Sequence, residues 1–396
     1  MTSSQNISAA PRPFFSALDG FRGLLALLVA VHHTQWFSYL NYKSFVNEGF
    51  VLIDLFFVFS GFLLYTLYGR KLKTGGDVAD FIKRRICRLY PIHIFMLFVF
   101  LGFNLLRLWV GGEPAAGETL AFGAGAPDNW TTFISHIFLT HSMGIHDSLS
   151  FNWPSWTISV EFYVYFIFAA VILFLRPNKA WHMALIATAI ALIYYGLLQV
   201  VSKITDAPKM DITYNYGFWR CIGGFFTGVI GAWLFKRFYH LKDTVSQAAW
   251  SLLELVALFA YLSFTIWFIG KSQFFIAPFA LLFVFVFAFD GGIISRIMSH
   301  RVFGYLAKIS YSVYMVHAII AVVFDKIGSK LLKGFVQPYN VEQGLWGDLY
   351  LIPYLIVVII ISHFTWRFVE GYGGRWLSRV LKVRTRAQPK TEVKAA

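Results

Sequence analysis

The sequence predicts an all-α polytopic membrane protein, and three observations support this fold class. Of the 396 residues, 58% are hydrophobic, 19% are aromatic and only 14% are charged, whereas soluble domains carry about 25% charged residues. The mean hydropathy is +0.61. The apolar residues come in long runs, so lipid is expected to surround most of the chain. A disordered chain, a coiled coil and a secreted disulfide scaffold are excluded.

Ten apolar stretches predict about ten transmembrane helices. Each is about 16–22 residues long, close to the length that crosses a hydrocarbon core of about 30 Å. They are Phe21–Phe37, Phe50–Tyr68, Ile92–Val110, Trp156–Leu175, Met183–Val201, Tyr216–Phe235, Ala248–Ile269, Phe274–Phe289, Ile309–Phe324 and Leu349–Phe368. Three segments are expected: a polar tail over 1–15, a single transmembrane domain over 16–372 and a basic cytoplasmic tail over 373–396.

The basic residues between these stretches predict the orientation. The chain has 34 Lys and Arg against 20 Asp and Glu, a net charge of +14. A ten-helix path puts most basic connections on one side, which the positive-inside rule assigns to the cytoplasm together with both termini. These residues are Arg70, Lys71, Lys73, Lys83, Arg84, Arg85, Arg88, Arg176, Lys179, Lys236, Arg237, Lys242, Arg296, Arg301, Lys308, Arg375, Arg379, Lys382, Arg384 and Arg386. This pattern is typical of a membrane protein and argues against nucleic-acid binding.

The opposite side is expected to be poor in basic residues. The long connection Gly111–Pro154 carries Glu113, Glu118, Asp128 and Asp147, and only Lys330 and Lys333 depart from the rule in a later outer loop. Cys87 and Cys221 lie far apart and suggest neither a disulfide nor a metal site. The histidines of the outer connection do not share one helical face, so no metal site is expected there. They are His136, His141 and His146.

The first helix carries two polar residues on one face. Arg22 and His33 are eleven residues apart, which at about 100° per residue puts both on one stripe with a rise of about 16 Å. Arg22 is then expected near the cytoplasmic mouth and His33 about halfway across the bilayer. The neighbouring His32 points about 100° away from this stripe. A membrane histidine can be simply packed and hydrogen-bonded, but ionisable groups at this depth are usually functional.

Other ionisable residues lie in the apolar stretches. Asp54 and Arg220 have matching depths, which indicates a buried ion pair that either fixes helix packing or takes part in chemistry. Glu161 follows Pro154 by about two turns and is expected at the level of His33, where a carboxylate would orient an imidazole base. Three further groups are interpreted as structural. They are Glu254, Asp290 and His363.

A basic amphipathic segment, Phe81–Pro91, is expected on the cytoplasmic surface. Arg85 and Arg88 share a helical face there. They suit either lipid headgroups or a phosphate-rich cytosolic ligand, because guanidinium groups bind phosphate oxygens well. The residues alone leave both interpretations open.

These segments together resemble the acyltransferase-3 family of integral-membrane O-acyltransferases, from about Phe15 to Arg375. Five motifs occur in the family's order. They are Arg22 with His33 (Arg-x10-His), Phe56–Phe62 (second helix), Arg85 with Arg88 (Arg-x-x-Arg), Trp156–Glu161 (Trp-x-x-Ser-x-Glu) and Ile309–His317 (late helix). One departure is Phe162, where many members have a second acidic residue. The chain looks like a stand-alone form without the extracytoplasmic hydrolase-like domain of some members.

The resemblance implies transfer of an acyl group, commonly acetyl, from cytosolic acyl-coenzyme A to a hydroxyl of a saccharide or lipid-linked glycan near the outer face. His33 would then be the base and Glu161 its partner, with no metal. Arg22, Arg85 and Arg88 would hold the phosphates of coenzyme A. Substrate-binding residues on the late helix would be Tyr311, Tyr314 and His317, as cavity lining or oxyanion donors.

Two other functions remain open from the residues. Ten helices with mid-membrane charges also suit an exporter of glycans or organic acids, although no internal repeat is visible. A non-enzymatic protein of a polysaccharide assembly machine is a third possibility. The expected location is a bacterial inner membrane, in contact with lipid, and the sequence does not indicate an oligomeric state.

Overall fold

The computed structural model describes residues 15–383, apart from 35, 37, 43–45, 47, 112–120, 124, 207, 269 and 333–340. Within these ranges the chain is helical and has no strand. Several residues named for the predicted topology fall outside the described residues. They are Glu113, Glu118, Lys333, Arg384 and Arg386. The side chain of Lys330 is not described either.

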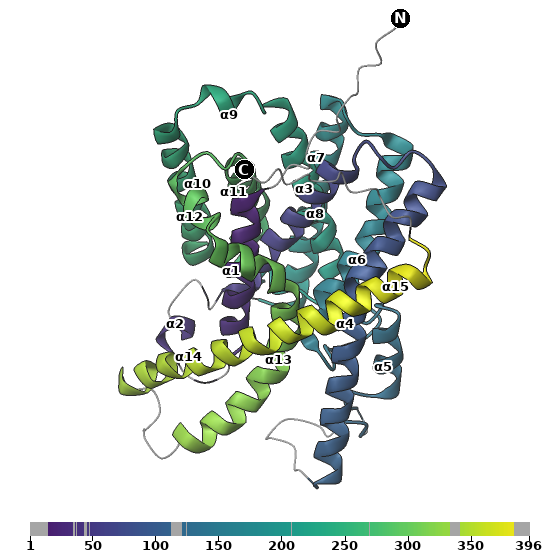
Figure 1. The fold of residues 1–396 in the computed structure, drawn as a ribbon, viewed down its shortest axis with the longest axis vertical. Helices are drawn as coiled ribbons and strands as arrows, with labels where there is room; N and C mark the ends of the chain where they lie inside the picture. The colour runs from purple at the N-terminus through teal and green to yellow at the C-terminus, as the bar shows by residue number, and fades with distance from the viewer. Residues whose placement is uncertain are drawn as a thin grey trace, which may run out of the picture.

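The helices follow one another along the chain, with the longest connections between α4 and α6 (Figure 1). They are α1 (Ser16–His32), α2 (Tyr39–Tyr42), α3 (Leu52–Tyr68), α4 (Gly75–Trp109), α5 (Trp130–Ile137), α6 (Trp156–Ala170), α7 (Ala180–Ile204), α8 (Gly217–Arg237), α9 (Leu241–Thr244), α10 (Gln247–Trp267), α11 (Ile276–Phe287), α12 (Ile293–Met298), α13 (Arg301–Leu332), α14 (Val341–Phe364) and α15 (Gly374–Val380). Short 3-10 turns are η1 (Gly49–Val51), η2 (Trp153–Ser155) and η4 (Gly270–Phe275), and π-helical segments are η3 (Val171–Leu175) and η5 (Thr365–Gly373).

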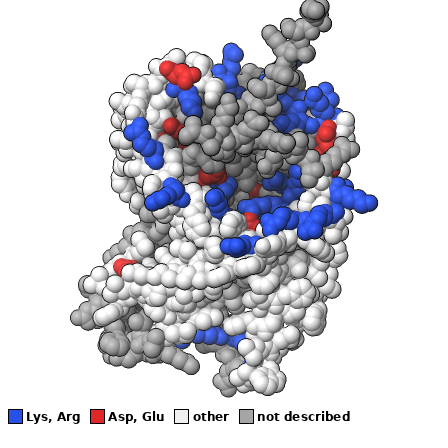
Figure 2. All heavy atoms as spheres, in the orientation of Figure 1, with Lys and Arg blue, Asp and Glu red and all other residues white. Residues whose placement is uncertain are grey.

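The described part of the chain contains nine segments that are long and apolar enough to cross a membrane. Helix α1, with 17 residues, is slightly shorter than these. The prediction of an all-α polytopic membrane protein is therefore confirmed. Figure 2 shows Lys and Arg side chains gathered over the upper half of the molecule and few on the lower half, as a one-sided distribution requires. The orientation of the termini stays a prediction.

Several helix boundaries differ from those predicted, and two of these differences affect the predicted site residues. Helix α1 spans Ser16–His32 and not Phe21–Phe37, so His33 lies at its C-terminal end and not at its middle. The reason is a tertiary cap: the carboxylate of Asp290 accepts hydrogen bonds from the backbone N–H groups of Ser16 and Ala17, at 3.1 and 2.9 Å. These bonds satisfy donors that a helix start leaves free, so the helix begins earlier.

Helix α4 is the second difference, because the predicted surface segment Phe81–Pro91 and the helix after it form one continuous helix. The helix starts at a capping box, in which Thr74 and Asp77 satisfy each other's backbone N–H groups. Pro91 is tolerated within it and packs so closely on the backbone of η5 that a Cβ on Gly373 would lie 2.9 Å from it. Arg85 and Arg88 are thereby fixed on a rigid element.

Close helix contacts hold the centre of the bundle together. A Cβ on Gly61 of α3 would lie 1.8 Å from the carbonyl oxygen of Phe225 on α8, so only glycine permits this approach. Glycine-mediated approach of backbones is the usual way in which membrane helices pack. In the same way, a Cβ on Gly23 of α1 would lie 2.7 Å from the backbone nitrogen of Ala307 on α13.

The predicted ion pair between α3 and α8 is confirmed. Arg220 donates from Nε and Nη2 to the two carboxylate oxygens of Asp54, at 3.1 and 2.8 Å. Its remaining donors reach the carbonyl oxygens of Ile212 and Phe50. The predicted structural role of Glu254 also holds, because its carboxylate accepts from the N–H groups of Gly292 and Ser295.

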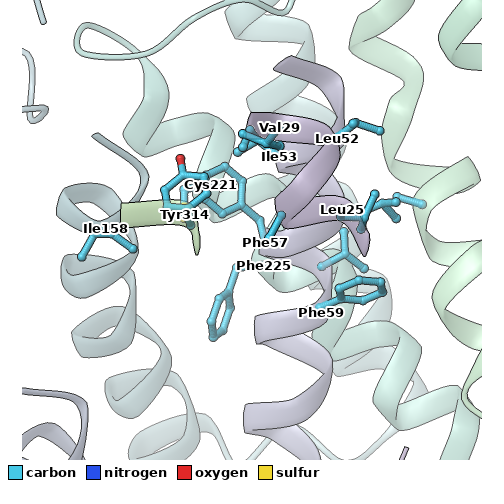
Figure 3. Close-up of a cluster of buried hydrophobic side chains, with 14 of the residues drawn as sticks. Leu25, Val29, Leu52, Ile53, Phe57, Phe59, Ile158, Cys221, Phe225 and Tyr314 are labelled. Atoms are coloured by element: carbon cyan, nitrogen blue, oxygen red, sulfur yellow. The ribbon is translucent and has the colours of Figure 1, made fainter. Parts of the chain in front are cut away.

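The central apolar core lies where five helices meet. Figure 3 shows side chains from α1, α3, α6, α8 and α13 in contact there. They include Leu25, Val29, Leu52, Ile53, Phe57, Phe59, Ile158, Cys221, Phe225 and Tyr314. Cys221 is a buried free thiol in this cluster, which agrees with the expectation of no disulfide. Because α1, α3, α6 and α13 carry the predicted motifs, this core fixes the motifs relative to one another.

Candidate active site

A narrow cavity of about 230 Å³ runs along one side of α3. Its wall follows α3 from Ile53 to Leu67, about 21 Å of helix axis. The opposite walls come from α1, α4, α6 and α13. Six of the eight predicted site residues line it, and they are Arg22, Arg85, Arg88, Glu161, Tyr311 and Tyr314. The cavity is therefore elongated and joins segments that are far apart in the sequence.

One part of the cavity is basic. The guanidinium group of Arg85 lies 5.8 Å from the ring centre of Phe81 and 5.9 Å from that of Tyr165. Arg22 pairs with Asp19 at 3.1 Å and donates to the carbonyl oxygen of Ala307 at 3.3 Å. In both arginines the Nε atom is buried and has no hydrogen-bond partner. Buried donors without partners are costly, so these two atoms are available to an acceptor in the cavity, either water or a ligand.

Arg88 differs from the other two because it has an internal partner. It forms an ion pair with Glu370 of η5 and lies over the ring of Tyr311, 5.3 Å from its centre. Ser312 donates to the second carboxylate oxygen of Glu370 at 3.1 Å. The sequence analysis missed Glu370, and the only signal for it was an acidic residue near the end of an apolar run. Arg88 still faces the cavity, with its charge partly compensated.

Glu161 lies between the basic part and the rest of the cavity. Its side chain hydrogen-bonds with Ser60 and Tyr165, and Arg85 and Arg88 are the nearest charges to it. One carboxylate oxygen, Oε1, is buried and has no partner. The predicted contact with His33 is not found, because Glu161 belongs to this hydrogen-bond group around Ser60. Ser60 is the polar residue within the predicted second-helix motif.

The two tyrosines of α13 line the cavity, but their hydroxyl protons are already used. Tyr311 donates to the carbonyl oxygen of Leu89 at 2.9 Å, and Tyr314 donates to that of Pro154 at 2.8 Å. Tyr314 also accepts a hydrogen bond from Thr157. The suggested donation to an oxyanion is therefore wrong for both hydroxyl groups. Their rings shape the cavity and tie α13 to α4 and α6.

His33 and His317 form a pair beyond Tyr314. Their rings are 5.0 Å apart, and the ring of Tyr314 lies 5.7 Å from that of His317. His33 Nδ1 lies 2.9 Å from the carbonyl oxygen of Val29 and 3.2 Å from His317 Nε2. Neither histidine lines the cavity itself. The predicted imidazole thus sits next to the end of the cavity that is opposite to Leu67.

The tautomers of both rings are assigned from their hydrogen-bond partners, with the His33 Nδ1–H shared between the carbonyl oxygen of Val29 and His317 Nε2. A carbonyl oxygen only accepts, so Nδ1 of His33 and Nδ1 of His317, 3.2 Å from the carbonyl oxygen of Val313, carry the protons. His317 Nε2 then accepts from His33. His33 Nε2 is left with a free lone pair, as a general base requires. The partners at Nδ1 are Val29 and His317, in place of the predicted Glu161.

His32 is excluded from this pair, as its place on the helix predicted. Its Nδ1 lies 2.8 Å from the carbonyl oxygen of Val46, and its ring packs against Gly49. On the other side of His33 lies Trp153 of η2, with ring centres 6.5 Å apart. The next residue back, Asn152, donates to the carbonyl oxygen of Met315 at 3.0 Å. His33 is therefore enclosed by the predicted outer connection as well as by α13.

The histidines of that outer connection form a separate cluster. The rings of His136 and His141 stack at 3.6 Å, and His93 of α4 lies parallel to both. Burial and the neighbouring histidines hold the pKa values of His136 and His141 well below their usual range. Across the described ranges of the chain, no group of His, Cys, Asp and Glu has the geometry of a metal site. This cluster is a packed, neutral part of the outer connection.

The comparisons with known proteins agree with this geometry. The acyltransferase-3 family model, described as an acyltransferase domain, matches residues 15–367. The O-acetyltransferase OatA of Staphylococcus aureus strain NCTC 8325 is 26% identical over 385 residues, which cover 91% of this chain and 57% of OatA. OatA of strain MRSA252 gives the same values. No solved structure matches the chain significantly.

The matched region includes every residue of the cavity and the histidine pair. The chain spans 57% of the length of the curated relatives that it matches. Because the family model covers nearly all of the described residues, the resemblance seen in the motifs is confirmed. The chain belongs to the acyltransferase-3 family and is a polytopic membrane protein.

Proposed function

We propose that this protein transfers an acetyl group from acyl-coenzyme A, bound from the cytoplasmic side, to a hydroxyl group of a saccharide or glycan that approaches from the outer side of a bacterial inner membrane. The observation that supports this most strongly is the cavity along α3. It has unpartnered Nε atoms of Arg22 and Arg85 in its basic part, and Tyr314, beside the His33–His317 pair, at its other end. A thioester with an anionic head and a long thin arm has this shape and charge distribution.

The reaction then follows from the free lone pair on His33. Nε2 takes the proton of the acceptor hydroxyl as its oxygen attacks the thioester carbonyl carbon. The new C–O bond forms, the C–S bond breaks, and the thiolate of coenzyme A leaves and takes up the proton held by His33. His317 keeps the imidazole in the required tautomer through its hydrogen bond to Nδ1.

The other site residues have supporting roles in this proposal. Arg22, Arg85 and Arg88 bind phosphate oxygens, with Glu370 setting how much of the charge of Arg88 is free. Glu161 is a positioning residue that holds the cavity wall through Ser60 and Tyr165 and lies near Arg85. Tyr311 and Tyr314 confine the arm of the ligand. The acetyl group is taken from the names of the relatives, which are O-acetyltransferases.

The test uses the purified full-length protein in lipid nanodiscs with labelled acetyl-coenzyme A and a glycan acceptor. His33→Gln is expected to lower turnover about 100-fold or more, because a general base contributes on that scale. His32→Gln is the matched control, because the His32 ring lies 5.1 Å from that of His33 but hydrogen-bonds the carbonyl oxygen of Val46 and not His33, and it should keep near-normal turnover. Near-normal turnover in His33→Gln would refute the base. Glycan transport without consumption of acetyl-coenzyme A would favour the exporter.

A further inference from the structure

A second, strongly basic pocket lies at the ends of α3, η3 and α8. Its cavity volume is about 520 Å³. Five cationic residues line it and no carboxylate does. They are Arg70, Lys73, Arg176, Lys236 and Arg237. All five lie in connections that the positive-inside rule assigns to the cytoplasm.

These cations are largely uncompensated. Among the described residues, none of the five forms an ion pair, and only Lys236 has a fixed contact, with the carbonyl oxygen and ring of Tyr65. Cations at helix C-termini are favourable, and basic residues on the cytoplasmic side are expected for topology alone. Neither explanation requires five cations around one pocket.

The pocket lies next to the arginine cavity. A small cavity between them shares Leu67 with the arginine cavity and shares Arg70 and Lys236 with the basic pocket. The three spaces therefore follow one another along α3 and past its C-terminal end. Figure 2 shows that Lys and Arg side chains gather over the half of the molecule that contains this end of α3.

The pocket also offers an aromatic wall. The indole of Trp233 donates from Nε1 to the carbonyl oxygen of Asn178 at 3.0 Å, which fixes the orientation of the ring. Trp233 is half-buried, so part of its ring faces the pocket. An oriented aromatic ring beside several cations is the combination that binds phosphorylated nucleotides, because bases stack on the ring and phosphates bind the cations.

We propose that this basic pocket binds the 3′-phosphoadenosine end of acyl-coenzyme A, while the arginine cavity holds the pyrophosphate and the arm. This inference rests on the proposed function. A cavity of about 230 Å³ is smaller than the range of about 300–1,000 Å³ that holds drug-sized ligands, so the whole of coenzyme A does not fit in it. The nucleotide has to lie outside, and the neighbouring basic pocket has the matching charge.

The test compares coenzyme A with dephospho-coenzyme A, which differs only in the 3′-phosphate. Binding of each is measured by calorimetry on the full chain in nanodiscs of phosphatidylcholine. The wild type is expected to bind coenzyme A about tenfold or more tightly than dephospho-coenzyme A, because several charge-assisted hydrogen bonds depend on that phosphate. The triple variant Arg70→Gln, Arg176→Gln, Arg237→Gln should bind both ligands equally, with its affinity for dephospho-coenzyme A unchanged.

The matched control is the double variant Arg296→Gln, Arg301→Gln. These exposed cations lie on α12 and α13 away from the pocket, and the control should keep the preference of the wild type. A triple variant that still prefers coenzyme A would overturn the inference while leaving the proposed function intact. Native mass spectrometry gives a second contrary result. The inference is overturned if the wild type retains an anionic phospholipid, the triple variant loses this lipid, and both proteins still prefer coenzyme A to dephospho-coenzyme A. Absence of coenzyme A binding in every form would instead refute the proposed function.

Discussion

The arginines on either side of α3, one fully buried and two half-buried, differ in how their donors are satisfied. Arg220, on the α8 side, makes two hydrogen bonds to Asp54 and reaches two backbone carbonyl oxygens. Arg22 and Arg85, on the cavity side, each keep a buried Nε without a partner. The first arrangement is complete within the chain, and the second leaves one donor of each arginine open, as the proposed binding of coenzyme A requires.

This difference shows why burial of a charge does not by itself identify a functional residue. Asp54 with Arg220 and Arg22 with Arg85 look alike in the sequence, since all are ionisable groups in or beside apolar runs. Their hydrogen-bond partners distinguish them. The predictions below test this distinction, from the largest expected effect to the smallest.

Removal of one member of the closed ion pair should have the largest effect. Arg220→Ala leaves Asp54 buried without a partner, which is expected to lower the free energy of unfolding by about 3–5 kcal/mol. Thermal unfolding of the purified protein measures this. The double variant Asp54→Leu, Arg220→Leu removes both charges and should recover much of the loss. If Arg220→Ala unfolds like the wild type but no longer binds coenzyme A, the pair is functional and the distinction fails.

Removal of an arginine on the cavity side should weaken coenzyme A binding and leave folding unchanged. Arg85→Gln is expected to weaken coenzyme A binding about 10- to 100-fold, the scale of one or two hydrogen bonds to a charged group. Its free energy of unfolding should change by less than about 1 kcal/mol, because the guanidinium group packs on two rings and Arg88 remains as a charge near Glu161. Lys83→Gln on the same helix is the control. Normal coenzyme A binding in Arg85→Gln would instead support the interpretation that Arg85 contacts lipid headgroups.

Substitution of His317, the partner of the proposed base, should have an intermediate effect on turnover. His317→Leu removes one of the two acceptors of the His33 Nδ1–H and leaves the carbonyl oxygen of Val29, so it is expected to lower kcat by about tenfold at most. The KM for acyl-coenzyme A should stay the same, since His317 does not line the cavity. His317→Gln, whose amide oxygen can accept the same hydrogen bond, should recover part of the rate. An unchanged kcat and pH profile in His317→Leu would contradict the positioning role.

The outer histidine cluster should give the smallest effect, through pH. Burial lowers the pKa values of His136 and His141 in the folded protein, so the unfolded state binds more protons below its pKa of about 6.5. The contribution of these two neutral histidines to the free energy of unfolding is therefore fully present above that pH and is lost as the pH decreases. The slope is up to about 1.4 kcal/mol per pH unit for each histidine. Thermal unfolding between pH 7.5 and 5.5 measures it.

The control for this prediction is the double variant His136→Asn, His141→Asn, which removes both titrating groups. Its unfolding temperature should depend less on pH than that of the wild type. An equal pH dependence in both proteins would show that other groups cause the acid sensitivity. The effect is structural, and coenzyme A binding at pH 7.5 should be the same in both.

The sequence was sufficient to predict which residues meet but not how they bond. Helical spacing singled out Arg22, and the family motifs added Arg85, Glu161 and Tyr314; the structure brings all four to one cavity beside α3. The preference for His33 over His32 agrees with the pairing of His33 and His317. These results depend on local geometry, which a sequence pattern contains.

The remaining features depend on contacts between distant segments. The start of α1 is set by Asp290, which is 274 residues away from Ser16. The partner of Arg88 is Glu370 of η5, and the partner of His33 is His317 in place of Glu161. No spacing rule contains such pairs, because they arise only when the helices are packed. The same reason explains why Pro91 lies within a continuous helix, packed against Gly373.

The most direct measurement is a structure of the protein in nanodiscs with bound coenzyme A. We predict density along α3, with phosphate oxygens within hydrogen-bond distance of Nε of Arg22 and Nε of Arg85, the thiol beside Tyr314 and His33, and no change at Asp54 and Arg220. Coenzyme A bound away from this cavity, with both Nε atoms still without partners, would contradict the account.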